Sequence, residues 1–248
     1  MEPLILGLVV APSAAGAWLA LSASATFLAR HPLKLVVLDR RRGARYPRTG
    51  LAERFFATYT AVAALSFVTA LSQSSISILA PLALAAPLAF FALGRDLQGR
   101  GREALPEIAG ALGLGSSATA IILAASGASA TAWTAWALIA LRIVATILYV
   151  RARVRIDRSE RPAVRSTLAR PVLTVHVTTL LMGLAATASG LVSPIASSAF
   201  ALLLARAAHG LSAGRAPVRP QILGIQEVFV GIACLGLFAA GLMSASSR

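Results

Sequence analysis

The chain has 248 residues, of which 57% are hydrophobic, and its 23 Lys and Arg residues against 9 Asp and Glu leave a formal net charge of +14. A soluble domain typically has about 25% charged residues, whereas only 13% are charged here. This composition argues strongly against a soluble enzyme, a disordered tail or a disulfide-bonded scaffold. It favours a membrane protein with basic loops.

Long uncharged segments predict membrane-spanning helices. The three longest are residues 55–94, 108–141 and 171–205. A spanning helix needs about 20 apolar residues, so each of these segments is long enough for two helices. Turn signals lie near their middles, at Ser72–Ser75, Gly127–Ser129 and Ser189–Gly190. The predicted spans are residues 10–29, 55–72, 76–94, 108–126, 132–150, 171–188, 191–208 and 225–244.

The basic residues concentrate between these spans. Of the 23 Lys and Arg residues, 21 lie in residues 30–54, 95–107, 151–170 and 206–224. Eight spans place all four segments on one face, and the positive-inside rule makes that face cytoplasmic. We therefore expect an all-α, polytopic helix bundle in the bacterial inner membrane, with residues 1–248 as a single transmembrane domain. The basic loops face anionic lipid headgroups, and the charge requires no nucleic-acid partner.

The amino-terminal segment does not fit a signal peptide, because its basic cluster follows the apolar stretch instead of preceding it. Residues 3–29 are too long for one upright span and too short for two. The single cysteine, Cys234, excludes an intrachain disulfide and is expected to be a small buried side chain.

Three ionisable residues stand out in the predicted spans, where such residues are candidates for function. Arg142 either caps a neighbouring helix or snorkels, or it faces inward to bind an anionic headgroup or a carboxylate. His176 is either a packed, hydrogen-bonded residue or part of a polar cavity. Glu227 is either a carboxylate stabilised near a helix N-terminus or a cavity residue.

Acidic residues in the loop 95–107 form a second candidate site. Asp96, Glu103 and Glu107 would share one face of a continuous helix, an arrangement suited to Mg²⁺ and diphosphate. Gly99 and Gly101 argue against a continuous helix, and Glu107 is then an ordinary first-turn charge. No metal site is assigned.

Arginines in two of the basic loops suit phosphate binding. Their planar guanidinium groups match a phosphate or diphosphate, and the alternative is interfacial contact with anionic lipid. The candidates are Arg100 and Arg102 in residues 95–107, and Arg151 at the start of residues 151–170.

Four stretches in order along the chain resemble those of the YwiC-like integral membrane proteins. They are residues 27–34, 96–107, 141–151 (which include Tyr149) and 223–227. The resemblance implies a polytopic membrane architecture and no particular activity; Tyr149 joins Arg142, His176 and Glu227 as a candidate cavity residue. The Glu-His-Gly-Ala-Trp-like motif that usually opens these proteins is missing, which leads us to expect a truncated upstream helix and nine spans in the complete protein.

A nine-span layout also resembles the UbiA-type prenyltransferases, which carry Asp-rich Mg²⁺ motifs on two cytoplasmic loops. The matching loops here hold only Asp39 and Glu53, and Asp157 and Glu160, among many arginines. This departure argues against Mg²⁺-dependent prenyl transfer.

The resemblance to the YwiC-like proteins leaves the activity unassigned, and three functional classes stay open. A prenyltransferase-like enzyme would use Mg²⁺ and act on an isoprenoid diphosphate or similar lipid. A small-solute transporter would place Arg142 and Glu227 along a path across the bilayer. An accessory protein would have a filled core and would bind a partner or lipid through its basic loops.

Overall fold

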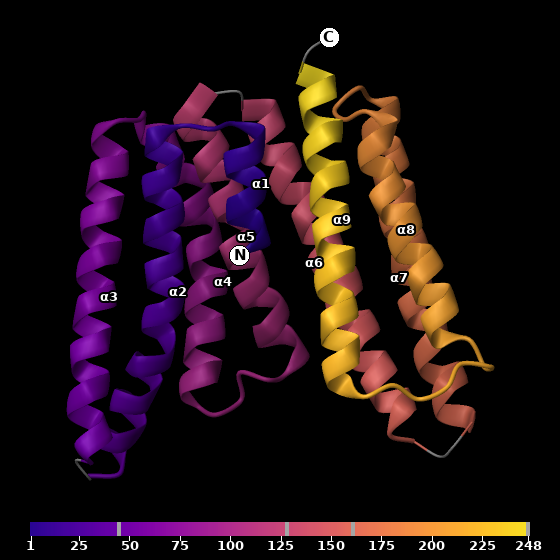
Figure 1. The fold of residues 1–248 in the computed structure, drawn as a ribbon, viewed down its shortest axis with the longest axis horizontal. Coiled ribbons are helices and arrows are strands. Elements are labelled where there is room, and N and C mark those ends of the chain that lie inside the picture. Colours follow the sequence, from indigo (N-terminus) through magenta and orange to yellow (C-terminus); the bar gives the residue numbers. More distant parts are fainter. Residues whose placement is uncertain (44–45, 127–128, 160–161, 247–248) are drawn as a thin grey trace. The chain divides into compact units, whose positions relative to one another are not determined.

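The computed structural model describes residues 1–43, 46–126, 129–159 and 162–246. Over these ranges, all of its regular secondary structure is helical (Figure 1). The described chain forms nine α-helices and one short 3₁₀ helix. Their bounds are α1 Glu2–Val10, α2 Ala14–Arg41, α3 Pro47–Ser72, η1 Ile76–Ile78, α4 Leu79–Leu97, α5 Ala104–Ser126, α6 Ser129–Asp157, α7 Pro162–Ala188, α8 Pro194–Leu211 and α9 Pro220–Ser246.

Seven helical segments within the described residues are long and apolar enough to cross a membrane. They correspond to α3 to α9, and they confirm a multi-pass helical membrane protein. The first predicted span falls mainly in α2, which has 28 residues but is not among the seven. Ser and Gly residues in its first half and basic residues from Arg30 onward lower its hydropathy.

The predicted turns lie where the helices end. α3 ends at Ser72, and α7 is followed by Gly190, whose φ of 76° is a left-handed conformation that glycine adopts without strain. Residues 127 and 128 of the second predicted turn lie outside the described residues, between α5 and α6.

The basic segments are more helical than the sequence analysis expected. α2 continues through Arg30 to Arg41, and α6 continues to Asp157, so residues 30–54 and 151–170 are only partly loops. Arginine is a good helix former, and its long side chain reaches water from a helix end. The helices therefore continue past the apolar segments.

The chain forms two compact units. The N-terminal unit contains Met1 and residues 3–132, and the C-terminal unit contains Glu2 and residues 133–248. The expectation of a single transmembrane domain stays a prediction.

Small residues bring the helices of the N-terminal unit together. In this unit α2 packs against α3 and α5, and α4 packs against α5 (Figure 1). The Ser22 hydroxyl on α2 donates a hydrogen bond to the Ala63 carbonyl on α3 at 2.9 Å. A Cβ on Gly7 of α1 would lie 2.9 Å from Cβ of Ile121 on α5. Close approach at small side chains is the usual packing mode of membrane helices.

The C-terminal unit is built in the same way. α8 packs against both α7 and α9. A Cβ on Gly183 of α7 would lie 2.6 Å from Cδ2 of Phe200 on α8, and Phe200 itself packs on Phe238 of α9 at 5.4 Å between ring centroids. The α6 helix joins this group through Tyr149, which contacts His176 of α7.

Candidate functional site: a polar cavity in the C-terminal unit

An ion pair lies inside the membrane-spanning part of the C-terminal unit. Arg206 of α8 donates through Nη1 to Oε2 of Glu227 on α9, and the two side chains are only 12% and 15% exposed. The Arg206 Nε and Nη2 atoms and the Glu227 Oε1 atom are buried without a hydrogen-bond partner among the described residues. Buried donors and acceptors of charged groups are costly when they are left unpaired.

Tyr149 of α6 connects this ion pair to a buried histidine. The Arg206 guanidinium lies 4.2 Å from the centroid of the Tyr149 ring, within cation–π distance. On the α7 side, the Tyr149 and His176 rings meet edge to face with centroids 6.3 Å apart. His176 Nδ1 lies 2.8 Å from the Val172 carbonyl and donates to it, since a carbonyl only accepts. Its buried Nε2 has no partner among the described residues.

A cavity of about 340 Å³ opens beside these residues. This volume falls in the usual range for small-molecule sites, which is about 300–1,000 Å³. Its lining combines cationic, acidic and apolar side chains. They are Tyr149, Arg206, His209, Arg215, Gln226, Glu227, Phe229 and Val230. Two arginines and a histidine against one carboxylate make the site suited to an anion.

Arg142 is neutralised inside the C-terminal unit. It lies on α6 two turns before Tyr149 and forms an ion pair through Nη1 with Glu2, which groups with the same unit. Its side chain is 11% exposed. Gly231 of α9 leaves room for the pair, because a Cβ there would lie 2.8 Å from Arg142 Nη2.

Two of the candidate acids in the N-terminal unit, Asp96 and Glu103, are paired with basic side chains. Asp96 accepts from Arg30 Nε at 2.9 Å and from Lys34 Nζ at 2.8 Å. Glu103 accepts from Arg95 and Arg100, each at 2.5 Å. These hydrogen bonds, that from Arg95 first, lower the pKa of Glu103 below its ordinary value.

The corner between α4 and α5 separates the three candidate acids. α4 ends at Leu97, Gly99 has a φ of 77°, and α5 starts at Ala104, so no continuous helix carries Asp96, Glu103 and Glu107. Arg102 lies in the same corner and Glu107 in the first turn of α5. Within the described ranges, no group of three or more His, Cys, Asp or Glu side chains is arranged to hold a metal ion.

Two loops were compared with the Asp-rich motifs of the prenyltransferases. The acidic residues described in these loops also pair with neighbouring side chains. Asp39 accepts from Arg48 and Thr49, Glu53 accepts from Arg40, and Asp157 pairs with Arg153. Glu160 lies outside the described residues.

The structure therefore brings together part of the residue set expected from the sequence. Tyr149 and Glu227 line one cavity, and His176 packs behind Tyr149. Arg142 and Arg151 lie on the same helix, outside the set of lining residues.

Four polar lining residues were absent from the expected site: Arg206, His209, Arg215 and Gln226. Both arginines belong to the basic segment 206–224, which was predicted as a loop. The sequence signal for Arg206 is its position within the predicted span 191–208, and α8 continues past it to Leu211.

These features define a multi-pass helical membrane protein whose C-terminal unit has an open cavity, lined by apolar side chains and by the largely buried Arg206–Glu227 ion pair. Residues 1–122 match the family model of the YwiC-like proteins, and on this match the chain belongs to the YwiC-like protein family. The match includes the stretches 27–34 and 96–107 and ends before 141–151 and 223–227. No curated protein and no solved structure matches the chain.

Proposed function

We propose that the protein is an eight-span inner-membrane protein whose C-terminal unit binds an anionic amphiphile, a lipid-like or isoprenoid molecule with a phosphate or carboxylate headgroup. The observation that carries the proposal is the 340 Å³ cavity at which Arg206 has two unpaired nitrogen atoms inside spanning helices. The headgroup accepts hydrogen bonds from this guanidinium.

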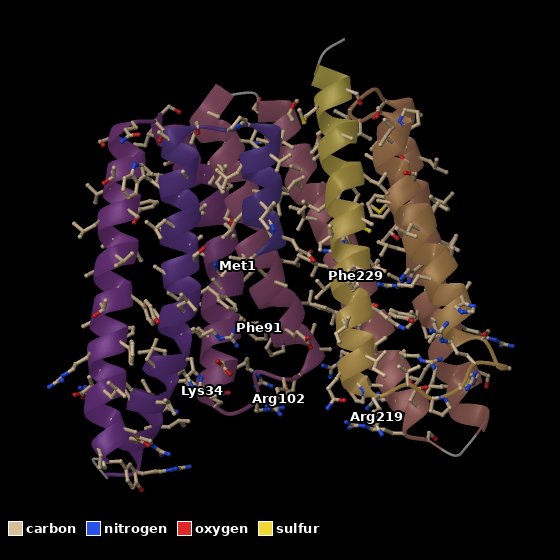
Figure 2. The ribbon with its side chains drawn as sticks, viewed as in Figure 1. Met1, Lys34, Phe91, Arg102, Arg219 and Phe229 are labelled. Carbon is tan, nitrogen blue, oxygen red and sulfur yellow. The ribbon has the colours of Figure 1, made fainter. Side chains whose placement is uncertain are left out.

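The proposed topology takes α2 as the eighth span and places the four basic segments on the cytoplasmic side. In the N-terminal unit, Lys34 and Arg102 lie toward the same end of the helices (Figure 2). This arrangement agrees with a single basic face in that unit. The positive-inside rule then supports a cytoplasmic orientation for that face.

The charge of the cavity supports an anionic ligand. The Arg206 guanidinium is a planar donor that suits two oxygens of a phosphate or carboxylate. Glu227 occupies only one of its nitrogens. Arg215 and His209 add donors around the same space without a second carboxylate. An incoming anion therefore completes hydrogen bonding that the protein alone leaves unmade.

The apolar side of the cavity supports an amphiphile. Phe229 of α9 lines the cavity and is 69% exposed (Figure 2). Ile225, Val228 and Ile232 on the same helix are exposed as well. In a membrane, exposed apolar side chains of a span contact acyl chains. A ligand with its headgroup beside Arg206 and its tail along α9 satisfies both environments.

Two other functions are less well supported. Mg²⁺-dependent prenyl transfer requires free carboxylates, yet Asp96 and Glu103 each accept from two basic side chains. Small-solute transport draws support from the Arg206–Glu227 pair inside the spans, because intramembrane ion pairs often mark transport pathways. Transport across a sealed vesicle would distinguish it from binding alone.

The test is binding to the purified full chain in lipid nanodiscs. The probes are farnesyl diphosphate, farnesyl monophosphate, oleate and, as an uncharged control, farnesol. We expect at least one anionic probe to bind, farnesol to bind much more weakly, and Arg206→Gln to weaken anion binding by about tenfold or more, as expected for a charge-assisted contact.

Arg155→Gln is the matched control, because Arg155 is an exposed arginine near the end of α6 and lies outside the cavity. It should bind like the wild type. Absence of binding by all three anionic probes at millimolar concentration, or equal binding by the wild type and Arg206→Gln, would overturn the proposed function.

A further inference from the structure

The segment that joins α8 to α9, residues 212–219, is held in place by one buried arginine of α6. Arg153 is 1% exposed, although arginine is almost never fully buried unless it is paired. Its Nη1 donates to the Gly210 carbonyl at the end of α8, and its Nη2 donates to the Ala216 carbonyl at 2.8 Å. A side chain that is normally a surface residue thus binds two backbone carbonyls from inside the unit.

Asp157, one turn further along α6, completes this attachment. Its Oδ2 lies 3.0 Å from Arg153 Nε and accepts from the Val218 backbone N–H at 3.3 Å. Arg165 of α7 adds a hydrogen bond to the Ser212 carbonyl. The segment 212–219 contains no helix or strand, so these bonds supply the backbone partners that regular structure supplies elsewhere.

The attached segment carries a residue of the cavity. Arg215 lines the cavity and immediately precedes Ala216, whose carbonyl Arg153 holds. Consecutive Cα atoms are 3.8 Å apart, so fixing Ala216 restricts where the Arg215 backbone can lie. On its other side, a Cβ added to Gly214 would meet nothing within 4 Å, so this residue offers no side-chain packing. The position of Arg215 thus depends on Arg153 and Asp157.

We propose that Arg153 is a positioning residue of the anion site: together with Asp157 it holds the α8–α9 connection so that Arg215 faces the cavity. This inference rests on the proposed function for the identity of the ligand. Holding the connection requires a guanidinium group, since its three nitrogens bind three separate acceptors. A lysine at this position keeps the charge but has a single nitrogen.

The first test needs no ligand. Trypsin cleaves after Arg215 when the connection can leave its attachment, whereas cleavage after Arg219 is blocked by Pro220. In nanodiscs we expect Arg153→Lys and Asp157→Asn to increase the rate of cleavage after Arg215 about tenfold, and Arg155→Lys to leave it at the wild-type rate. Cleavage after Arg102, in the N-terminal unit, reports whether each variant is otherwise folded.

The second test measures affinity for whichever anionic probe binds the wild type. We expect Arg153→Lys and Arg215→Gln each to weaken binding by about tenfold, the size of one charge-assisted contact. Because Arg153 acts through Arg215, the double variant should bind like Arg215→Gln alone, which is strong coupling in a double-mutant cycle. Farnesol binding should be unchanged in all three variants.

The outcomes separate the two proposals. If the wild type binds no anionic probe, the proposed function fails and takes the ligand-positioning role with it, while the cleavage rates still decide whether Arg153 holds the connection. If the wild type binds but Arg153→Lys binds equally well, or if the two substitutions weaken binding additively, the positioning role is refuted and the anion site stands.

Discussion

The Arg206 guanidinium on α8 lies 4.2 Å from the ring centroid of Tyr149 on α6, while its Nη1 donates to Glu227 on α9. One cation therefore connects three helices of the C-terminal unit. The aromatic face and the carboxylate both stabilise a charge that the membrane interior disfavours. The same contacts hold the guanidinium at the cavity, so the stability of the unit and the geometry of the site are coupled.

Gly210 is required for the placement of Tyr149. A Cβ at this position would collide with the Tyr149 hydroxyl and would lie 2.8 Å from its Cζ. We expect Gly210→Ala to destabilise the protein by about 1–3 kcal/mol, the usual cost of overpacking. The measurement is thermal unfolding of the purified protein in detergent.

The double variant Gly210→Ala/Tyr149→Phe identifies the cause, since it removes the hydroxyl that the methyl group meets. It should recover part of the lost stability. Gly214→Ala is the control, because a Cβ there meets nothing within 4 Å. Equal destabilisation by both alanine substitutions would contradict the steric explanation.

Glu227 and Arg206 depend on each other in the folded protein. We expect Glu227→Gln to destabilise the C-terminal unit by about 3–5 kcal/mol, because it leaves the buried guanidinium without its counter-ion. Replacing both residues, as Arg206→Leu/Glu227→Leu, should be less destabilising than Glu227→Gln alone. Urea denaturation of the proteins in detergent micelles measures both differences in the free energy of unfolding. A double variant that is no more stable than the single one would show that the pair stabilises the fold directly.

The helical hairpins were predictable because an uncharged segment much longer than one span indicates two helices joined by a turn. The segment 171–205 is too long for one span, and the glycine near its middle is the turn between α7 and α8. The helix ends on the basic side were not predictable in this way. Arg30 continues α2, and Arg153 lies buried on α6, although charge counting treats both as loop residues.

The candidate site was predictable only where an ionisable residue lies in a predicted span and outside the four basic segments. Glu227 and His176 were identified on this basis. Arg206 was not, because it was counted with the basic segment 206–224, although the predicted span 191–208 also includes it. The cavity itself depends on how α6, α8 and α9 are rotated about their axes, and no spacing in the sequence specifies that rotation.

Asp39 makes the stability of the N-terminal unit depend on pH in the acidic range. It lies in the last turn of α2, beyond the predicted span, is 1% exposed, and accepts from Arg48 at 3.0 Å and from Thr49 at 2.8 Å. These hydrogen bonds, that from Arg48 first, lower its pKa from the ordinary value of 3.8. Folding lowers the pKa, so the stabilisation is present above pH 3.8 and is lost as the pH falls through the lowered value.

The measurement is thermal unfolding of wild type and Asp39→Asn between pH 7 and pH 3. The wild type should be the more stable protein at neutral pH, and the difference should shrink as the carboxyl becomes protonated. Glu53→Gln serves as a comparison, because Glu53 pairs with Arg40, a side chain that is 70% exposed, and surface pairs contribute little. A difference for Asp39→Asn that stays constant over the whole pH range would show that its charge is not involved.

The eighth span can be tested at the two ends of α2. Pro12 and Arg42 are exposed residues on either side of this helix. If α2 crosses the bilayer with its basic end in the cytoplasm, a membrane-impermeant maleimide should label Pro12→Cys in intact cells and label Arg42→Cys only after permeabilisation. Cys234 is buried and is replaced by alanine in the background. Gln73→Cys, in the turn after α3, should behave like Pro12→Cys, because α3 returns the chain to the outer side. Labelling of Pro12→Cys and Arg42→Cys from the same side would leave seven spans and place α2 along the membrane surface.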